Sequence, residues 1–312
     1  MEKAEKERLL YDTFGRPVNN LRVSLTQRCN FRCFFCHREG EQNASEELSA
    51  EEIGRLVEVA SSLGMRSVKL TGGEPLLRED IVDIVSSIAP HVDEVSMTTN
   101  GTLLEEYAED LHRAGLRRVN ISLHSLDSEN FKRITESNAF DSVKNGIRAA
   151  VECGLEPVKL NMVVLKGLND MEIPRMIEFS KACGAILQLI EFQPIQAGTE
   201  PYWQSLYYDL RGIEDTLQAN SLKIQVRELQ RRKQYYLKGG EVVEVVRPMH
   251  NTDFCRYCTR LRVTSDGKLK PCLMRNDNLV GVLQLLREGS KQEALETAFK
   301  EAVSRRQPYW RS

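Results

Sequence analysis

The chain has 312 residues, of which 41% are hydrophobic, and its formal net charge is −2. This length suits one large α/β domain or a barrel with a smaller appendage, and the charge lacks the general basic field that nucleic-acid binders use. The charged first eight residues and the lack of a long apolar run predict a cytoplasmic protein without a signal sequence or membrane span.

Hydrophobic patterning between residues 21 and 191 predicts alternating strands and helices. Six strands are expected, at 21–25, 67–70, 92–98, 118–123, 158–164 and 186–191. Helices are expected from the capping box at Ser49 to before Gly64, and at 80–88, 103–114, 140–152 and 170–183. This alternation indicates a parallel sheet of βα units. Periodicity alone does not distinguish a flat doubly wound sheet from a partial barrel.

Three cysteines follow the first predicted strand with the spacing C-x3-C-x2-C: Cys29, Cys33 and Cys36. Such spacing lets three thiolates turn inward from one loop and hold one metal centre. Zinc usually takes four protein ligands, whereas an iron–sulfur cluster is also held by cysteines. A zinc knuckle therefore stays open as the alternative at this point.

The tetrapeptide Gly72-Gly73-Glu74-Pro75 follows the second predicted strand and would be interpreted as a turn if it stood alone. One βα unit after the cysteine loop, it resembles the methionine-binding motif of the radical S-adenosylmethionine (SAM) family. The resemblance implies a partial (β/α)6 barrel of TIM type and a 4Fe–4S cluster whose open iron binds SAM. It also implies SAM contacts at five positions: Phe35, Gly72, Gly73, Glu74 and Ser122.

The rhythm breaks after residue 192, and Lys238-Gly239-Gly240-Glu241 predicts a turn between two strands. A second set of cysteines follows: Cys255, Cys258 and Cys272. Ser265-Asp266-Gly267 between two alternating segments predicts a hairpin that returns Cys272 to Cys258. Arg260 and Arg262 then share one face of a strand. They predict a clamp for phosphate or carboxylate, or else solvated arginines on a zinc-stapled hairpin.

The two cysteine sets together, with Arg260-Leu261-Arg262 in the second, resemble the GTP 3′,8-cyclase family of molybdenum cofactor biosynthesis. The resemblance divides the chain into a barrel over residues 1–200 and an α+β extension over 201–312 that carries a second 4Fe–4S cluster. It implies seven GTP contacts: Arg22, Lys69, Thr98, Lys159, Arg260, Leu261 and Arg262. No side chain is assigned a catalytic role, because the radical is borne by the cofactor.

The reaction implied by this resemblance converts GTP to 3′,8-cyclo-7,8-dihydro-GTP. A 5′-deoxyadenosyl radical from SAM abstracts the ribose 3′ hydrogen, and the C3′ radical attacks C8 of guanine. The implied partners are an electron donor and a downstream cyclic pyranopterin monophosphate synthase. The sequence does not report the oligomeric state, for which a homodimer is one option.

The chain departs from the family pattern at several positions. Lys69 stands where Arg is usual, Phe35 where Tyr is commoner, and Gln188 and Gln193 where many members have Arg and a SAM-contacting Met. The chain ends Pro308-Tyr309-Trp310-Arg311-Ser312, whereas many members end in a Gly-Gly that enters the active site.

Other cysteines and histidines are expected to have ordinary roles. Cys153 and Cys183 are interpreted as core residues, and His124 and His250 as pocket-lining or surface residues. His37, next to Cys36, is not expected to be a fourth ligand. Two alternative functions stay open: another radical SAM enzyme that acts on a peptide or small molecule with an electron-transfer cluster, and a non-catalytic module stapled by zinc.

Overall fold

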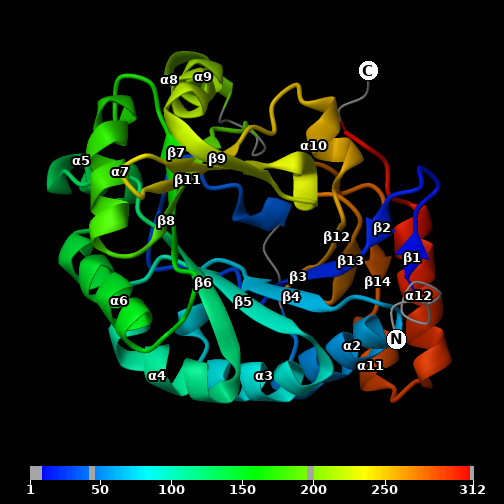
Figure 1. Cartoon of the computed structure of the whole chain (residues 1–312). Coiled ribbons are helices and arrows are strands. Elements are labelled where there is room, and N and C mark those ends of the chain that lie inside the picture. The colour runs from blue at the N-terminus through cyan, green and yellow to red at the C-terminus, as the bar shows by residue number, and fades with distance from the viewer. Residues whose placement is uncertain (1–8, 42–45, 195–199, 310–312) are drawn as a thin grey trace.

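A curved, open sheet of twelve strands forms the centre of the computed structural model, which describes residues 9–41, 46–194 and 200–309. Figure 1 shows helices along the convex face of the sheet. Arg38 and Glu39, from a short turn, line a cavity on the concave side. The strand order is β14-β13-β12-β3-β4-β5-β6-β7-β8-β11-β10-β9. The predicted α/β fold built on a parallel sheet is confirmed.

Six consecutive parallel strands form the middle of the sheet, as the sequence predicts. They are β3 (Asn20–Ser24), β4 (Ser67–Thr71), β5 (Glu94–Thr99), β6 (Leu116–Ser122), β7 (Lys159–Val164) and β8 (Ile186–Glu191). The helices between them are α2 (Ala50–Ser62), α3 (Ile81–Ile88), α4 (Leu104–Ala114), α5 (Ser128–Thr135), α6 (Phe140–Glu152) and α7 (Ile173–Ala182). Short 3₁₀ turns are η1 (Arg38–Gly40), η2 (Pro75–Leu77), η3 (Ala89–His91) and η4 (Asp170–Glu172).

The C-terminal part of the chain lengthens this sheet at both edges. One edge receives β9 (Ser221–Val226), β10 (Lys233–Leu237) and β11 (Val242–Val246), with η5 (Leu229–Arg231) between the first two strands. The other edge receives β12 (Arg260–Val263), β13 (Lys268–Lys270) and β14 (Val280–Gly281). Since β11 runs parallel to β8 and β12 parallel to β3, the parallel part of the sheet has eight strands. The sequence predicts the two hairpins but not their attachment to opposite edges.

Additional elements surround the two edges. The helices are α8 (Glu200–Leu206), α9 (Arg211–Asn220), α10 (Thr252–Arg256), α11 (Leu283–Arg287) and α12 (Gln292–Ser304). A separate two-stranded ribbon pairs β1 (Leu10–Tyr11) with β2 (Pro17–Val18). The sequence analysis missed α5. Its start is capped by Asp127, which accepts from the Asn130 N–H. The division at residue 200 stays a prediction.

Alternation along each strand separates the apolar core from the hollow. In β3, Leu21 and Val23 are buried in the core, whereas Asn20 and Arg22 face the cavity described below. Register aligns such polar positions across neighbouring strands, because side chains at paired positions point to the same face. One aligned row is Arg262, Arg22, Lys69, Ser96 and Arg118, and a second is Thr98, Asn120 and Lys159. The sheet thus presents rows of polar side chains to its hollow.

None of the helices in the described ranges is long and apolar enough to cross a bilayer.

Close packing of α6 on the loop before α4 yields a stability prediction. A Cβ at Gly146 would lie 2.2 Å from the Gly101 carbonyl oxygen, so G146A should destabilise the fold by about 1–3 kcal/mol through overpacking. The control is G212A in α9, where no atom lies within 4 Å of the added Cβ; Ala there should stabilise by about 0.5–1 kcal/mol. Thermal unfolding checks both, and equal effects of the two substitutions would contradict this account of the packing.

Candidate active site

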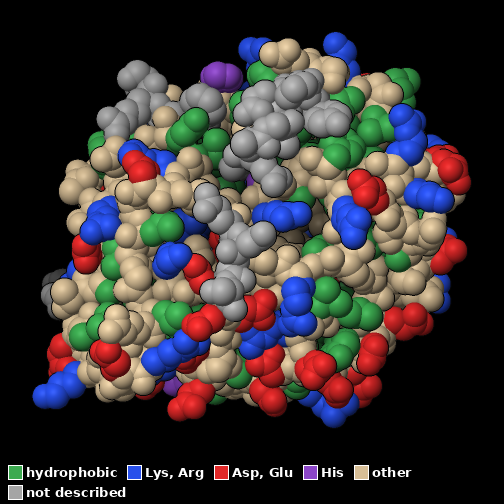
Figure 2. Space-filling view, turned by 180° about the vertical axis from the view of Figure 1, so that it is seen from behind, with side chains coloured by type: hydrophobic (Ala, Val, Ile, Leu, Met, Phe, Trp, Pro, Cys, Tyr) green, Lys and Arg blue, Asp and Glu red, His purple; other side chains and the backbone are tan. Residues whose placement is uncertain are grey.

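All six clustered cysteines line one cavity of about 370 Å³ on the concave side of the sheet. The first set comes from the loop after β3, and the second from α10, the turn after it and the segment after β13. Figure 2, viewed from behind, shows Lys and Arg side chains beside a hollow near the middle of the molecule. The predicted hairpin of β12 and β13 is confirmed, and it brings Cys272 to the same cavity as Cys258.

The first cysteine loop is a compact turn whose thiols lie near one another. The Cys36 N–H donates to the Cys33 carbonyl over 2.9 Å, and backbone N–H groups of Phe31 and Arg38 lie 3.4 Å from the sulfurs of Cys29 and Cys36. Burial raises the pKa of the Cys33 thiol, and the neighbouring Cys36 and Cys29 raise it further. Three ionised thiols would repel one another there, so the trio needs a cationic centre to be stable as thiolates.

Gly72 and Gly73 allow the loop after β4 to pack directly on the chain that leads into these cysteines. They pack against residues 26–28. The Gly73 N–H donates to the Thr26 carbonyl over 2.6 Å, and the Glu74 N–H donates to the Arg28 carbonyl over 2.7 Å. A Cβ at Gly72, whose φ is +144°, would lie 2.5 Å from the Thr26 oxygen, and one at Gly73 would lie 2.1 Å from the Arg28 oxygen. Glycine is therefore required at both positions because the two backbone segments lie too close for a Cβ atom, whether or not the glycines also contact a ligand.

Glu74 does not line the cavity, and its side chain instead holds neighbouring loops together. Its buried carboxylate accepts from the Thr99 hydroxyl over 2.7 Å, the Asn100 N–H over 2.6 Å and the Leu76 N–H over 3.0 Å. It thereby ties the loop after β4 to the loop after β5. The structure thus gives Glu74 a supporting role, and its contact with SAM stays a prediction.

A buried ion-pair network holds the second cysteine set. Asp12 pairs with Arg16 at 2.7 Å and with Arg306 at 3.1 Å. These two guanidiniums donate to the carbonyls of Cys255 and Cys258 over 2.9 and 2.5 Å. Burial alone would raise the pKa of the Cys258 thiol, but Arg306 and the cavity arginines lower it. The segment after α12 reaches the same place, because Arg306, Gln307 and Tyr309 also line the cavity.

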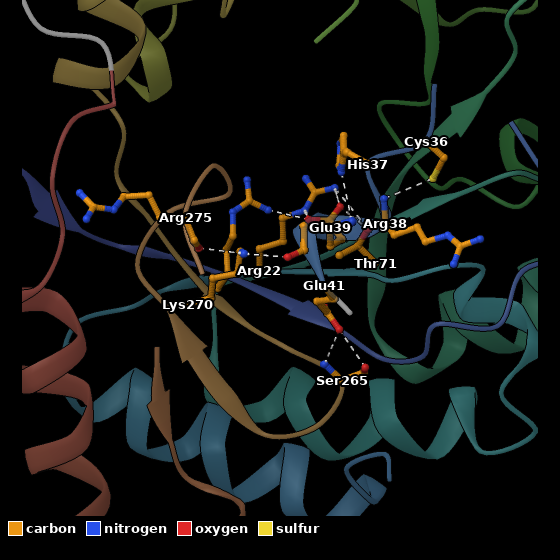
Figure 3. A network of polar contacts seen from close by, with 12 residues as sticks. Arg22, Cys36, His37, Arg38, Glu39, Glu41, Thr71, Ser265, Lys270 and Arg275 are labelled. Carbon is orange, nitrogen blue, oxygen red and sulfur yellow. Dashed lines mark hydrogen bonds and ion pairs between the residues drawn. The ribbon is translucent and has the colours of Figure 1, made fainter. Parts of the chain in front are cut away.

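Glu39, which the sequence analysis missed, joins two of the predicted substrate arginines (Figure 3). Its carboxylate accepts from Arg22 over 2.6 and 3.1 Å, from Arg262 over 2.6 Å and from the Thr71 hydroxyl over 3.1 Å. Burial would raise the pKa of Glu39, but the two guanidiniums hold it well below its usual range. We call Glu39 with Arg22, Arg260 and Arg262 the Glu39 group.

The turn that carries Glu39 is fixed on both sides, as Figure 3 also shows. The Lys270 ammonium donates to the carbonyls of Gly40 and Arg275 over 2.9 and 3.0 Å, and Glu41 accepts from the Ser265 N–H and hydroxyl over 3.0 and 2.8 Å. A Cβ at Gly40 would lie 2.6 Å from the Leu273 carbonyl oxygen. This turn thus connects the first cysteine loop to the hairpin that carries Cys272.

A second buried carboxylate, that of Glu244 in β11, forms ion pairs with several cations at the other side of the cavity. It pairs with Lys159 at 2.5 Å, with Arg232 at 3.0 Å and with Arg227 at 3.5 Å. The amides of Gln188 and Gln234 donate to it over 2.7 and 2.8 Å. Burial would raise the pKa of Glu244, but the cations lower it to about 2. We call Glu244 with Lys159, Arg227 and Arg232 the Glu244 group.

Lys69 lies between the two groups and donates to Asn120 over 2.9 Å. Burial lowers the pKa of Lys69, and the nearby Arg118 and Arg22 lower it further. Among the described residues, the cavity is lined by eleven Lys and Arg side chains but only two carboxylates, Glu39 and Glu191. This excess of positive charge, in a chain whose net charge is −2, suits a polyanionic ligand.

The rest of the cavity wall includes aromatic and titratable side chains near Phe35. The His124 ring lies edge-on to Phe35 with centroids 4.9 Å apart, and burial lowers the pKa of His124 to about 4. Glu191 at the end of β8 accepts from the Tyr207 hydroxyl over 3.2 Å, and burial raises its pKa to about 7. The Nδ1 atom of His37 accepts from the Glu39 N–H over 3.1 Å, which occupies that nitrogen.

The structure brings most of the predicted ligand contacts to one cavity. Those that line it are Phe35, Gly72, Gly73 and Ser122 of the SAM set, and Arg22, Lys69, Thr98, Lys159, Arg260 and Arg262 of the GTP set. Leu261 differs, because its side chain is fully buried in the core on the opposite face of β12. Cys153 and Cys183 end α6 and α7 and pack against the core, as predicted.

The donor sets fit iron–sulfur clusters. Each trio of thiols lines the cavity together with groups that stabilise thiolate charge: backbone N–H groups at the first set and guanidiniums at the second. In the described ranges, no three His, Cys, Asp or Glu side chains are grouped as around a single metal ion. Among the described residues, none of the eight cysteines forms a disulfide.

Comparison with known proteins covers nearly the whole chain. The model of the Radical SAM superfamily matches residues 23–180, and that of Molybdenum Cofactor Synthesis C matches residues 185–312. A Thermococcus kodakarensis protein is 53% identical over 308 residues, which cover 97% of this chain and 100% of the relative. Proteins of Pyrococcus abyssi and Archaeoglobus fulgidus are 49% and 46% identical, each over 97% of this chain and 100% of the relative. All three are named "Probable GTP 3′,8-cyclase".

The chain belongs to the GTP 3′,8-cyclase family of radical SAM proteins. Its cofactors are therefore SAM and 4Fe–4S clusters, of which the second is held in the C-terminal part. Solved structures agree in fold: Streptococcus suis SuiB bound to S-adenosylmethionine has a TM-score of 0.66 at 18% identity, over 96% of this chain and 70% of SuiB. The protein anSMEcpe with bound AdoMet has a TM-score of 0.62 at 16% identity, over 89% and 82%. Membership favours the cluster interpretation over the zinc alternatives.

The packing of Gly73 predicts a selective effect of G73A. The added Cβ would push the Arg28 carbonyl away and displace the chain just before Cys29. We expect the variant to lose the iron of the first cluster and SAM cleavage while it keeps the second cluster, so that iron per chain falls by about half. The control is G281A, whose Cβ meets no atom within 4 Å. Iron analysis with SAM cleavage checks this; full iron content in G73A would refute it.

Buried lysines predict that anion binding weakens at high pH. Burial lowers the pKa of Lys159 to about 8, although Glu244 opposes this shift. As pH rises through 8, the ammonium becomes neutral and its attraction for an anion disappears. The affinity for inorganic triphosphate should therefore fall above pH 8, by up to about tenfold per pH unit.

The matched variant is K69R/K159R, since arginine stays protonated in this range. Its affinity for inorganic triphosphate, measured by isothermal titration calorimetry, should change less between pH 7 and 9 than that of the wild type. The same slope in both proteins would show that the lysines do not cause the decline.

Proposed function

We propose that this protein converts GTP to 3′,8-cyclo-7,8-dihydro-GTP in the first step of molybdenum cofactor biosynthesis. The family membership supports the reaction class, and the cavity supports the substrate class. Both cysteine sets and the two cation groups surround one space, so a nucleoside triphosphate in it would reach thiol-bound centres and basic side chains together.

One observation carries the assignment of an anionic substrate. Arg260 lines the cavity, its Nε atom is buried without a hydrogen-bond partner, and no carboxylate among the described residues pairs with it. Burial and the neighbouring Arg22, Arg232 and Arg262 lower the pKa of this guanidinium far below its ordinary value. A phosphate would supply the missing partner through a charge-assisted hydrogen bond.

The chain's own residues bind, orient and enclose the reactants. Cys29, Cys33 and Cys36 would hold one cluster, which with SAM would supply radical chemistry at the ribose; Cys255, Cys258 and Cys272 would hold the second cluster, which would supply a binding site for the guanine base. Arg22, Arg260, Arg262, Lys69 and Lys159 hold the triphosphate, and Thr98 contacts the nucleotide. Phe35, Gly72, Gly73 and Ser122 border the SAM position. A buried cavity restricts the hydrogen sources that a carbon radical could reach.

The proposal extends to partners and location. An electron donor reduces the first cluster, and a cyclic pyranopterin monophosphate synthase uses the product. Six of the eight cysteines fall into two clusters that suit metal ligation in a reducing compartment, for which we propose the cytoplasm. We also propose a homodimer and a functional division into a barrel of residues 1–200 and an extension of residues 201–312.

The test is an anaerobic turnover assay of protein reconstituted with iron and sulfide. With SAM, dithionite and GTP, we expect GTP-dependent 5′-deoxyadenosine and a product isomeric with GTP, measured by mass spectrometry. C272A should lose the GTP product and about half of the iron. SAM cleavage with equal yield whatever nucleotide is present would reject GTP and leave another radical SAM activity. Full turnover by C272A would reject a substrate role for the second cluster.

A further inference from the structure

Two arginines that neither the sequence motifs nor the family comparison assigned extend into the cavity from its C-terminal edge. Arg227 and Arg232 flank η5, and the Arg227 N–H donates to the Arg232 carbonyl over 2.8 Å, which closes the turn between β9 and β10. Within that turn the Gln230 N–H donates to the Tyr257 carbonyl over 2.8 Å. The turn is thus fixed between the Glu244 group and the second cysteine set.

Arg232 is built into the cavity wall rather than exposed on the surface. Its side chain is 10% exposed, its NH1 atom lies 3.0 Å from Glu244, and its Nε atom is buried without a hydrogen-bond partner. Arg227 is more open, at 32% exposure, and lies 3.5 Å from the same carboxylate. Both side chains line the cavity with Lys159.

Glu244 alone does not balance the cations around it. Lys159, Arg227 and Arg232 bring three positive charges to one carboxylate, which also accepts from Gln188 and Gln234. Desolvated cations are costly unless they are paired. The remaining charge and the orphaned Arg232 Nε therefore indicate a second anion on the cavity side of Glu244.

We propose that Arg232, assisted by Arg227, binds the phosphate chain of the substrate from the side opposite the Glu39 group. The strand order supports this arrangement, because β12 and β3 carry Arg260, Arg262 and Arg22 near one edge of the sheet, whereas β7 and β11 carry Lys159 and Glu244 toward the other. A polyphosphate between the two groups would be held from both sides, and a shorter phosphate would reach fewer of the cations. The inference rests on the proposed function and makes Arg232 a determinant of selectivity for triphosphate.

The experiment compares GTP with GMP, so that the phosphate chain is the only variable. Equilibrium affinities are measured anaerobically by calorimetry for the cluster-loaded wild type, R232Q and R227Q/R232Q. Glutamine keeps a hydrogen-bond donor near Glu244 but removes the charge. The control is R211Q in α9, where the exposed Arg211 pairs with Asp209 away from the cavity.

We expect R232Q to weaken GTP about tenfold or more while GMP changes less than about threefold, as the loss of one charge-assisted contact predicts. R211Q should bind both nucleotides like the wild type. If R232Q is unstable in thermal unfolding, R232K serves instead, and GTP affinity should fall while GMP affinity is kept, because lysine retains charge without the fork.

Two results would overturn the inference while the proposed function stands: equal loss of GTP and GMP affinity, or no loss of either. Failure of the wild type to bind GTP would instead reject the proposed function.

Discussion

The structure depends on a balance of charge among buried side chains that line one cavity. Many cationic side chains point into one hollow, and crowding them there is unfavourable unless counter-charges are present. Two buried carboxylates, Glu39 and Glu244, supply part of this balance and fix the orientation of the cations around them. The balance is left incomplete on the cavity side, where a triphosphate would complete it. Stability and substrate binding are therefore linked through the same side chains.

The parallel sheet explains how residues far apart in the sequence meet at this cavity. Arg262, Arg22 and Lys69 occupy aligned register positions on three neighbouring strands, so their side chains point the same way. Both cysteine sets line the same cavity, and the turn of Glu39 and Gly40 connects them through Arg262 and Lys270. The C-terminal extension completes the cavity because its strands join both edges of the sheet. The extension therefore forms part of the cavity wall.

The sequence predicts the site's chemistry better than its supports. Cysteine spacing, the glycine motif and Arg260–Arg262 are local patterns. Together with the family resemblance they identify six thiols and five of the eleven Lys and Arg side chains that line the cavity. Glu39 and Glu244 could not be identified, because their ion pairs join elements far apart in the sequence and depend on sheet order and on where the turn of residues 38–40 lies. The sequence carries one signal for such residues, namely polar side chains at alternate positions of otherwise apolar strands, such as Gln188 and Glu244. Glu74 and Leu261 show the reverse limit: a motif also includes residues that hold loops together or pack in the core, beside those that line the cavity.

The most direct test of the account is an anaerobic crystal structure of the cluster-loaded protein with GTP and SAM. The account predicts phosphate oxygens within hydrogen-bond distance of the guanidiniums of Arg22, Arg260 or Arg262, with Glu39 and Glu244 still paired to their cations. A structure in which the phosphates lie outside the cavity, and the cations keep only their present partners, would contradict it.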